Sequence, residues 1–297
     1  MLSFCLFQSA RAGSLRDEVT ADQTEAAVNW GLVQGALGKQ GQMMQGRVFA
    51  FTLGREDFVA YAEGVRLLPS FAMSAEIYFK HMGNTTMVMG EIPLRQTEIN
   101  PTVSRLFSRG LMVTAIHNHR IEMSPQVMWI HFMGQGRAAN LAAAVRYALP
   151  AGGAHFSSGA SPAATSILRA GQLQQILGGQ TRVDEGGVIT VAIQRRDQIR
   201  MNGRVIPPAM GVEQEIYFQP LGGTRAAVTG ELPLLAAEVN PVAQTLRQRG
   251  IQVTALHNHM LTEQPRLFYL HSWATGDAYA LARSLRAALD RSNTGRS

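Results

Sequence analysis

The chain has 297 residues, of which 46% are apolar and 16% charged, and its formal net charge is +6. This length supports one large or two ordinary hydrophobic cores. The apolar runs are too short for a membrane-spanning helix, so we expect no integral membrane association. The basic residues, 25 Arg and two Lys, are scattered along the chain, which does not favour a nucleic-acid-binding surface. The single cysteine excludes an internal disulfide and a cysteine-based zinc site.

Residues 1–24 form an N-terminal segment with features of a targeting signal. The apolar run Leu2-Ser-Phe-Cys-Leu-Phe7 precedes Ala10-Arg-Ala12, which resembles a signal-peptidase site. We interpret the segment as a signal-peptide remnant, which favours a periplasmic or secreted location. An ordinary N-terminal extension of a cytoplasmic protein is the alternative.

The rest of the chain consists of two copies of one unit. Glu76-Ile-Tyr-Phe79 matches Glu215-Ile-Tyr-Phe218, and Gly90-Glu-Ile-Pro-Leu94 matches Gly230-Glu-Leu-Pro-Leu234. Such self-similarity indicates an internal duplication. The predicted boundaries are residues 25–149 for unit 1, 150–165 for a Gly/Ser/Ala linker, 166–291 for unit 2 and 292–297 for a tail.

Hydrophobic periodicity predicts helices and strands within each copy. In unit 1 a first helix is followed by three strands, a second helix, a two-strand segment and a third helix. The second helix is expected to be capped by Asn100, with Pro101 as its first residue, and to end at Gly110. This order predicts an α+β fold of two tandem homologous units, each a mainly antiparallel sheet with helices, related by a pseudo-twofold axis. The remaining predicted ranges are helices over 22–38 and 137–148, and strands near 46–53, 74–80 and 85–90.

Six of the eight histidines recur in the same local sequence in both copies. Unit 1 places His117 and His119 two residues apart, so that in a strand both point to one face. If the segment around Pro125 reverses the chain, His131 lies across from His117 or diagonal to it, and the three imidazoles converge. The matching residues of unit 2 are His257, His259 and His271.

Three histidines with a nearby carboxylate form a ligand set typical of transition metals. Glu91 in unit 1 and Glu231 in unit 2 are the candidate carboxylates, and zinc is the expected ion. Manganese, iron, copper and nickel are alternatives, as is calcium, although calcium prefers more oxygen ligands. A hydrogen-bonded histidine cluster without metal is the other interpretation. Only eight of 23 positions match between residues 111–133 and 251–273, and these include every histidine, which favours metal ligation.

The functional hypothesis is a metal-dependent hydrolase of a small ester, lactone or amide. Glu98 and Glu238 are candidate proton-transfer groups, although each could instead favour the N-terminus of the helix that follows it. Asn258 could orient a ligand. The alternatives are a non-catalytic metal- or solute-binding envelope protein and a redox metalloenzyme. The sequence has no Gly-rich nucleotide loop and no Gly-x-Ser-x-Gly motif, so no nucleotide cofactor is expected.

The run Thr229-Gly-Glu-Leu-Pro-Leu-Leu235, together with Gly250-Ile-Gln-Val-Thr-Ala-Leu-His-Asn-His-Met260, resembles the LppY/LpqO family. This resemblance implies tandem units and an envelope or exported protein, and it implies no particular reaction. Cys5 lacks a clear lipobox, so lipid anchoring is not expected. Unit 1 departs from unit 2 at Arg120 and Phe132, so the unit 2 site is favoured if only one is active. The oligomeric state is left open.

Overall fold

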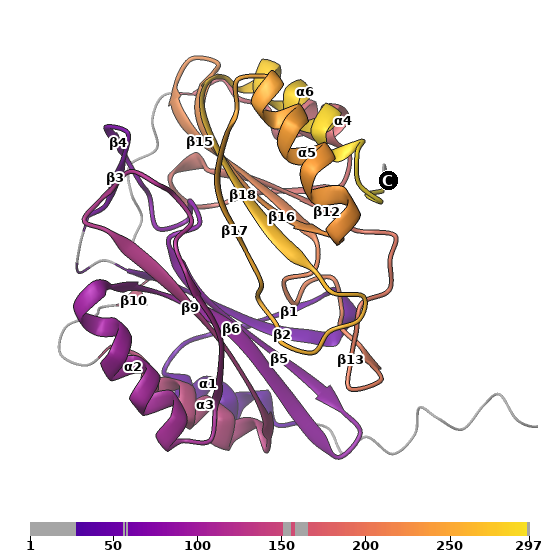
Figure 1. Ribbon diagram of the computed structural model, residues 1–297. Helices are drawn as coiled ribbons and strands as arrows, with labels where there is room; N and C mark the ends of the chain where they lie inside the picture. Colours follow the sequence, from indigo (N-terminus) through magenta and orange to yellow (C-terminus); the bar gives the residue numbers. More distant parts are fainter. Residues whose placement is uncertain (1–27, 56, 58, 151–155, 158–165, 296–297) are drawn as a thin grey trace, which may run out of the picture.

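The computed structural model describes residues 28–55, 57, 59–150, 156–157 and 166–295. The N-terminal segment, most of the linker and the last two residues of the tail lie outside these ranges. The molecule has four layers, in the order helices, sheet, sheet, helices (Figure 1). Both helical layers are outermost, so the two sheets face each other across the centre. This arrangement confirms the expected α+β fold of two units.

Unit 1 contains an antiparallel sheet with the strand order β1-β2-β5-β6-β9-β7, and β10 pairs with β2. A small sheet of β4, β3 and β8 lies beside it. The histidine strands β9 and β7 lie at one end of the main sheet, as the predicted hairpin requires. The elements are α1 (Trp30–Leu37), β1 (Gln42–Met44), η1 (Gln45–Arg47), β2 (Val48–Arg55), β3 (Tyr61–Ala62), β4 (Val65–Arg66), β5 (Ser74–Met82), β6 (Thr85–Arg95), α2 (Gln96–Ser108), β7 (Met112–His117), β8 (Met123–Ser124), β9 (Val127–Gly136), α3 (Ala138–Ala148) and β10 (Phe156–Ser157).

Unit 2 repeats this plan with the antiparallel order β11-β12-β15-β16-β18-β17 and a separate β13-β14 hairpin. Its elements are α4 (Ala170–Leu177), β11 (Gln180–Val183), η2 (Glu185–Gly187), β12 (Ile189–Ile193), β13 (Arg200–Met201), β14 (Arg204–Val205), β15 (Gln214–Gly222), β16 (Arg225–Leu234), α5 (Ala236–Gln248), β17 (Gln252–His257), β18 (Phe268–Asp277) and α6 (Ala278–Leu289). None of the helices in the described ranges is long and apolar enough to span a bilayer.

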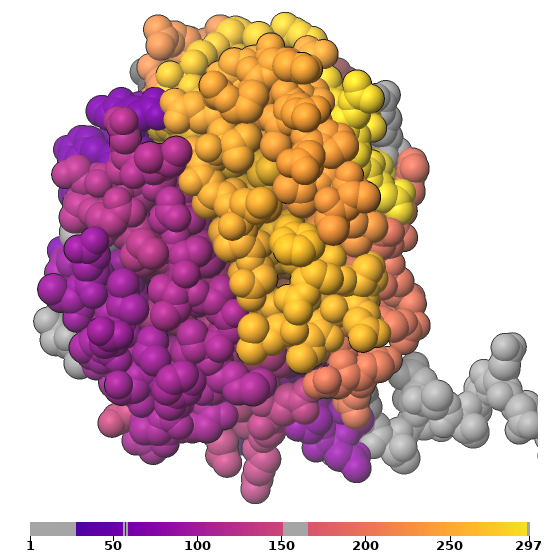
Figure 2. Space-filling model, viewed as in Figure 1, coloured from indigo at the N-terminus to yellow at the C-terminus, as the bar shows by residue number. Residues whose placement is uncertain are grey.

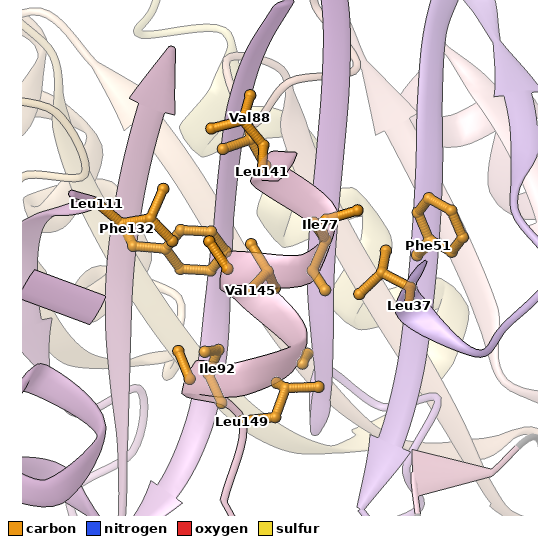
Figure 3. Packing of buried hydrophobic residues seen from close by; sticks show 14 of the residues in the cluster. Leu37, Phe51, Ile77, Val88, Ile92, Leu111, Phe132, Leu141, Val145 and Leu149 are labelled. Carbon is orange, nitrogen blue, oxygen red and sulfur yellow. The ribbon is translucent and has the colours of Figure 1, made fainter. Parts of the chain in front are cut away.

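Each unit has an apolar core between its sheet and its helices. In unit 1 alternate residues of β5, Ile77 and Phe79, are fully buried on the helix side with Val145 of α3 (Figure 3). Fully burying one such side chain contributes about 1.5–3 kcal/mol. Because strand side chains alternate, Glu76 and Tyr78 point to the opposite face, toward the other unit. The helical layer thus determines which residues of the sheet are available at the centre.

The second helix of each unit begins earlier than the sequence analysis predicted. α2 starts at Gln96, so Asn100 and Pro101 lie inside the helix and do not cap it. The reason is that the Glu98 carboxylate accepts a hydrogen bond from the Arg95 amide at 2.8 Å, which closes the helix N-terminus three residues upstream. The C-terminal prediction is confirmed, since α2 ends at Ser108, just before Gly110 with φ of +73°.

Two apolar clusters join the sheets of the two units. One includes Met87 and Met133 of unit 1 with Met210, Met260 and Tyr269 of unit 2. The surfaces of the two units meet along a seam in Figure 2. The other cluster includes Phe71 and Trp129 of unit 1 with Tyr217 and Trp273 of unit 2. The histidine strands lie between these clusters, so the junction of the units is packed on both sides of the site.

Candidate metal centre

The structure brings all six repeated histidines into one cluster at the junction of the units. The hairpin prediction is confirmed: β7 and β9 are antiparallel, with His117 opposite Trp129 and His131 opposite Ala115, so His131 lies diagonal to His117. Unit 2 has the same register in β17 and β18. Ring centroids of many of the histidine pairs lie 3.3–6.5 Å apart. The triplets therefore meet and do not form two remote sites.

Each histidine stacks on a histidine of the other unit. His117 and His257 lie 3.3 Å apart between ring centroids. His119 stacks on His271 at 4.0 Å, and the equivalent pair His131 and His259 stacks at 3.7 Å. A rotation that exchanges the two units converts the pair His119 and His271 into the pair His259 and His131. The same rotation converts the pair of His117 and His257 into itself. The cluster thus has the predicted pseudo-twofold symmetry, with that pair nearest the axis.

Reciprocal hydrogen bonds hold the histidine segments across the junction. The Thr114 hydroxyl donates to the His259 carbonyl at 2.5 Å, and the Thr254 hydroxyl donates to the His119 carbonyl at 2.6 Å. The Asn258 amide, a candidate orienting group, donates to the carbonyls of Thr114 and Met260, each at 2.9 Å. Asn258 therefore braces the backbone beside the cluster.

The Nε2 atoms of all six histidines are buried and lack a hydrogen-bond partner among the described residues. Leaving such atoms unpaired is costly, which points to a ligand. Nδ1 of His117 lies 3.1 Å from the Asn118 carbonyl oxygen, and Nδ1 of His257 lies 3.2 Å from the Asn258 carbonyl oxygen. Because a carbonyl only accepts, Nδ1 carries the proton in both rings and Nε2 keeps its lone pair for a metal.

Burial keeps these imidazoles neutral. Burial lowers the pKa of His131 to about 3, and burial followed by the charge of the neighbouring His131 lowers the pKa of His257 to about 3. The pKa of His119 and that of His271 are also well below the usual range, first through burial and then through the neighbouring rings. Neutral imidazole is the form that binds a metal ion.

Carboxylates lie beside the histidines in matching rows on the two sheets. In unit 1 Glu76 pairs with Glu91, and Glu91 pairs with His131 across β5, β6 and β9. Residues directly opposite in a sheet share a face, so this row faces the junction. Nε2 of His131 lies 3.2 Å from the Glu91 carboxylate, and Nε2 of His119 lies 3.8 Å from it. The row Glu215, Glu231 and His271 is the unit 2 equivalent.

These carboxyl groups repel one another in a buried environment. Burial, followed by the charges of neighbouring glutamates, raises the pKa of Glu76 and that of Glu91 to about 8. The same causes raise the pKa of Glu231 well above its usual value. A bound cation would favour the ionised forms, and until one binds these groups hold protons near neutral pH.

Three groups of residues bring their ligand atoms within 4.8 Å of one another and could hold a metal ion. Two of the three combine residues of both units, which answers a question that the sequence left open: the two triplets approach one another across the junction. The first group is the unit 1 triplet His117, His119 and His131; the second is His117, His257 and His259; the third is His119, Glu231 and His271.

A cavity connects with the cluster on the carboxylate side. Its inner part, of about 40 Å³, is lined by Glu91, His131, Glu231 and His259 among others, and has room for water. A larger cavity of about 300 Å³ shares lining residues with it, including Glu76, Tyr78, Gly211 and Glu215. A small molecule in the larger cavity would thus approach the histidines past the two outer glutamates.

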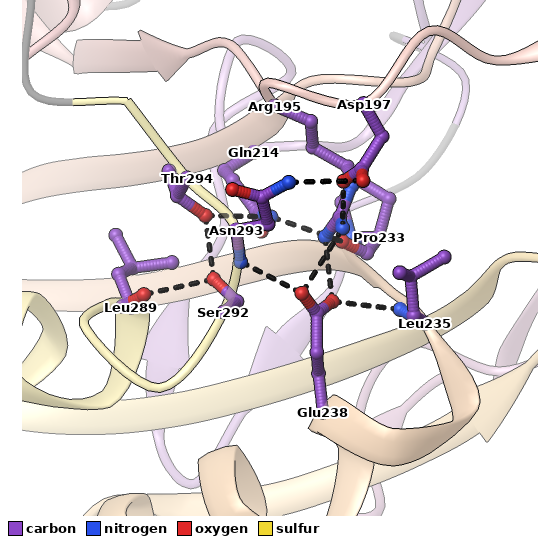
Figure 4. Close-up of polar contacts among 10 residues, drawn as sticks. All are labelled: Arg195, Asp197, Gln214, Pro233, Leu235, Glu238, Leu289, Ser292, Asn293 and Thr294. Carbon is purple, nitrogen blue, oxygen red and sulfur yellow. Dashed lines mark hydrogen bonds and ion pairs between the residues drawn. The ribbon is translucent and has the colours of Figure 1, made fainter.

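Glu98 and Glu238 do not join the cluster. Glu238 pairs with the buried Arg195 at 2.8 Å and accepts hydrogen bonds from the amides of Leu235 and Asn293 (Figure 4). Glu98 makes the equivalent ion pair with Arg55 at 3.0 Å. Both carboxylates accept a hydrogen bond from the backbone amide at a helix N-terminus, and both pair with a buried arginine. This placement gives them a structural role, and they are not part of the function that we propose.

Sequence reasoning missed three residues that line the cavity, Glu76, Tyr78 and Glu215. The two glutamates were recognised only as part of the repeated Glu-Ile-Tyr-Phe motif, and each accepts a hydrogen bond from the hydroxyl of the tyrosine two residues later, Tyr78 or Tyr217. The available signal was the alternation in this motif, which places the Glu and the Tyr on one face and the apolar residues on the other. A repeated carboxylate in a buried strand requires a partner in the same way as a repeated histidine.

A family model matches residues 32–151 and again residues 171–291, and its description is Domain of Unknown Function (DUF1259). The chain belongs to the DUF1259 family. Both matches contain one histidine triplet, so each DUF1259 unit contributes half of the cluster. This result agrees with tandem units and leaves the LppY/LpqO resemblance as a proposal.

Comparison with other proteins adds no activity to the DUF1259 units. No curated protein matches the chain. Two solved structures are similar to it: EtuB from Clostridium kluyveri, at 9% identity, covers 84% of this chain and 88% of its own, with a TM-score of 0.20. The trimeric bacterial microcompartment shell protein PduB, at 11% identity, covers 84% and 89%, with a TM-score of 0.21. Scores this low support no argument about function.

Proposed function

We propose that the chain is a metal-dependent hydrolase that acts on a small ester, lactone or amide at the junction of its two units. The observation that carries this proposal is the set of six buried Nε2 atoms without hydrogen bonds among the described residues, beside a cavity lined with carboxylates. Imidazole ligands favour zinc, with manganese, iron, copper and nickel as alternatives, and they disfavour calcium, which prefers ligand sets made of oxygen atoms.

The residues around the cavity can take different chemical roles in hydrolysis. A divalent metal, when bound, supplies a Lewis acid and lowers the pKa of water toward neutrality. Glu91 lines the inner cavity, and its Oε2 atom has no hydrogen-bond partner within the described part of the chain. Because it also lies 3.2 Å from Nε2 of His131, this carboxyl group is placed to accept and return a proton beside the cluster. Glu91 therefore takes the proton-transfer role that the sequence analysis gave to Glu98 and Glu238.

A second candidate function is metal or solute binding without catalysis. The feature that favours it is the depth of the cluster, because His119 and His271 are only 1% exposed. Turnover requires substrate to reach the ligands, whereas storage of a metal ion does not. A redox metalloenzyme remains a third hypothesis. The thioether of Met260, which could assist a soft metal, is buried in the apolar cluster between the units.

The location of the protein is a separate part of the proposal. We infer that it is exported to the periplasm or secreted, on the basis of the signal-like segment and the LppY/LpqO resemblance. Cell fractionation of the native host, probed with an antibody against the folded units, tests this point. Recovery with cytoplasmic markers alone would contradict it.

The test of function begins with the metal content of protein purified without chelators. Inductively coupled plasma mass spectrometry is applied to the wild type, to the double variant His257→Ala/His259→Ala, and to His81→Ala as a control. His81 lies on β5 and contacts Thr86, outside the cluster. Metal should be present in the wild type and the control and be lost from the double variant.

Activity is then measured on panels of small esters, lactones and amides with the metal that was found. Hydrolysis by the wild type and the control, but not by the folded double variant, supports the hydrolase. Metal binding without turnover supports the binding protein. Turnover of redox substrates that follows iron, copper or manganese content supports the third hypothesis. Absence of metal, with no uptake from added divalent ions, contradicts the hydrolase, the redox enzyme and metal binding, and leaves solute binding as the remaining hypothesis.

A further inference from the structure

We propose that the histidine cluster holds two metal ions and that residues of both units bind each ion. This inference rests on the proposed function only in treating the cluster as a metal centre. The inference goes beyond the proposed function because it assigns the number of ions and the ligands of each ion.

Two of the candidate ligand groups have no residue in common. Site A consists of His117 from unit 1 with His257 and His259 from unit 2, and site B consists of His119 from unit 1 with Glu231 and His271 from unit 2. Within each group the ligand atoms lie within 4.8 Å of one another. Both sites can therefore be filled at once, and neither can form without the other unit.

The two sites are neighbours. Ring centroids of His117 and His119 are 5.2 Å apart, and those of His257 and His271 are 4.9 Å apart. Two-metal sites place their ions about 3.5–4 Å apart, and this spacing of the ligand rings suits such a pair. Glu231, a ligand of site B, also lies 3.6 Å from Nδ1 of His259 in site A. At this position the Glu231 carboxylate can orient the His259 ring through Nδ1, which leaves Nε2 of His259 for the ion of site A.

The charge of the surroundings also fits two ions. Neutral imidazoles supply no negative charge, so the glutamates must balance the metal. Four of them line the inner cavity beside the cluster: Glu76, Glu91, Glu215 and Glu231. When ionised they carry four negative charges, which two divalent cations would neutralise. Buried carboxylates are retained when they are paired or coordinate a metal.

The remaining candidate group is the unit 1 triplet. It cannot bind an ion while sites A and B are occupied, because it shares His117 with site A and His119 with site B. His131 and Glu91 are then left beside the cavity as a pair 3.2 Å apart. This division leaves Glu91 available for the proton transfer proposed above.

The experiment counts ions in the full-length chain. Metal-free protein is titrated with Zn²⁺, and the stoichiometry is read by isothermal titration calorimetry and native mass spectrometry. His257→Gln removes a ligand of site A, His271→Gln removes a ligand of site B, and His81→Gln is the matched control. Circular dichroism confirms that each variant is folded. We expect two ions in the wild type and the control, and one in each site variant.

A wild type that binds one ion, with that ion lost from both site variants, overturns the two-ion inference. The proposed function would survive that result if the one-ion protein hydrolyses substrate. Two ions in the wild type that are both lost from one variant and both kept by the other would overturn the assignment of ligands. The wild-type count alone is decisive if a variant does not fold.

Discussion

His117 and His257 stack face to face across the junction of the two units, with ring centroids 3.3 Å apart and planes inclined by 16°. They occupy equivalent positions in the two copies, so each is the symmetry partner of the other. Their Nδ1 atoms face the carbonyl oxygens of the asparagines that follow them. Both rings therefore keep a free Nε2 lone pair at the centre of the cluster.

The threonines that hold the cluster should matter for both stability and metal affinity. Thr114→Val removes the hydroxyl that donates to the His259 carbonyl, and Thr254→Val removes its counterpart at the His119 carbonyl. Each change should lower the free energy of unfolding by about 1–3 kcal/mol, because a buried carbonyl loses its donor. Metal affinity should fall about 10-fold or more, as expected when groups that orient the ligands are removed.

Urea denaturation and calorimetric Zn²⁺ titration measure these two effects. Thr245→Val is the control, since the exposed Thr245 hydroxyl bonds only within α5. An effect at Thr114 no larger than that at Thr245 would show that the reciprocal bonds do not hold the junction.

The metal-free protein should lose stability as the pH rises from 6.5 to 8. The pKa of Glu76 and that of Glu91 are raised from 4.5 to about 8 in the folded chain, so the folded state binds more protons than the unfolded state between these values. Their contribution to stability is complete below pH 4.5 and is lost as the pH approaches 8. The expected loss between pH 6.5 and 8 is about 2 kcal/mol.

The histidines act in the opposite direction at lower pH. The pKa of His131 and that of His257 fall from 6.5 to about 3, so the unfolded state binds more protons between pH 3 and 6.5, and stability falls with the pH in that range. Urea titrations in the presence of chelator at pH 6.5 and 8 isolate the carboxyl effect. Glu76→Gln should flatten the dependence, and a wild type whose stability rises above pH 6.5 would refute this account.

Glu238→Gln should destabilise the fold and leave the metal site intact. The substitution removes the charge of one of the two carboxylates that pair with the buried Arg195 guanidinium and leaves Asp197 as the other, which costs about 1.5–3 kcal/mol. Metal stoichiometry should remain that of the wild type at temperatures where the variant is folded. Thermal unfolding and elemental analysis test the two statements separately. Loss of metal from the folded Glu238→Gln variant would show that Glu238 contributes to the metal site.

The outer glutamate of the cavity should affect turnover and not metal content. Glu215 lines both parts of the cavity and is absent from the three candidate ligand groups. Glu215→Gln should lower kcat/KM about 10-fold to 100-fold, as expected for a residue next to the ligands, with an unchanged ion count. The exposed Glu122→Gln is the control and should have wild-type kinetics. Equal rates for the two variants would exclude the cavity as the substrate path.

Much of the local structure could be predicted from the sequence because its causes are local. The hairpin of β7 and β9 followed from the local pattern, and the repeat showed that unit 2 does the same, whereas His119 lies just past the end of β7 at His117. The pairing of Arg55 with Glu98 could not be predicted, because those residues are 43 positions apart and the sequence does not show which side chains meet. For that reason the sequence could not decide between the two roles given for Glu98 and Glu238, proton transfer and support of a helix N-terminus.

The junction of the units was beyond sequence reasoning for a similar reason. Periodicity shows that a sheet has two faces, but it does not show what covers the second face. Glu76 and Tyr78 lie opposite the helix-covered residues Ile77 and Phe79, and only the docking of unit 2 explains their burial. The stacking of His119 on His271 likewise results from the docking of the two units, and it could not be predicted from the sequence of either unit alone.

Shared ligands also limit how the two halves of the chain can evolve. After most duplications one copy is free to change while the other preserves the original role. In the metal centre that we propose, the second and third candidate ligand groups each combine residues of both copies, so a mutation of His117 or His119 damages a group that the other half completes. Neither copy can lose these histidines without affecting the groups of the other copy. This mutual dependence accounts for two copies that differ at most positions and yet keep all six histidines.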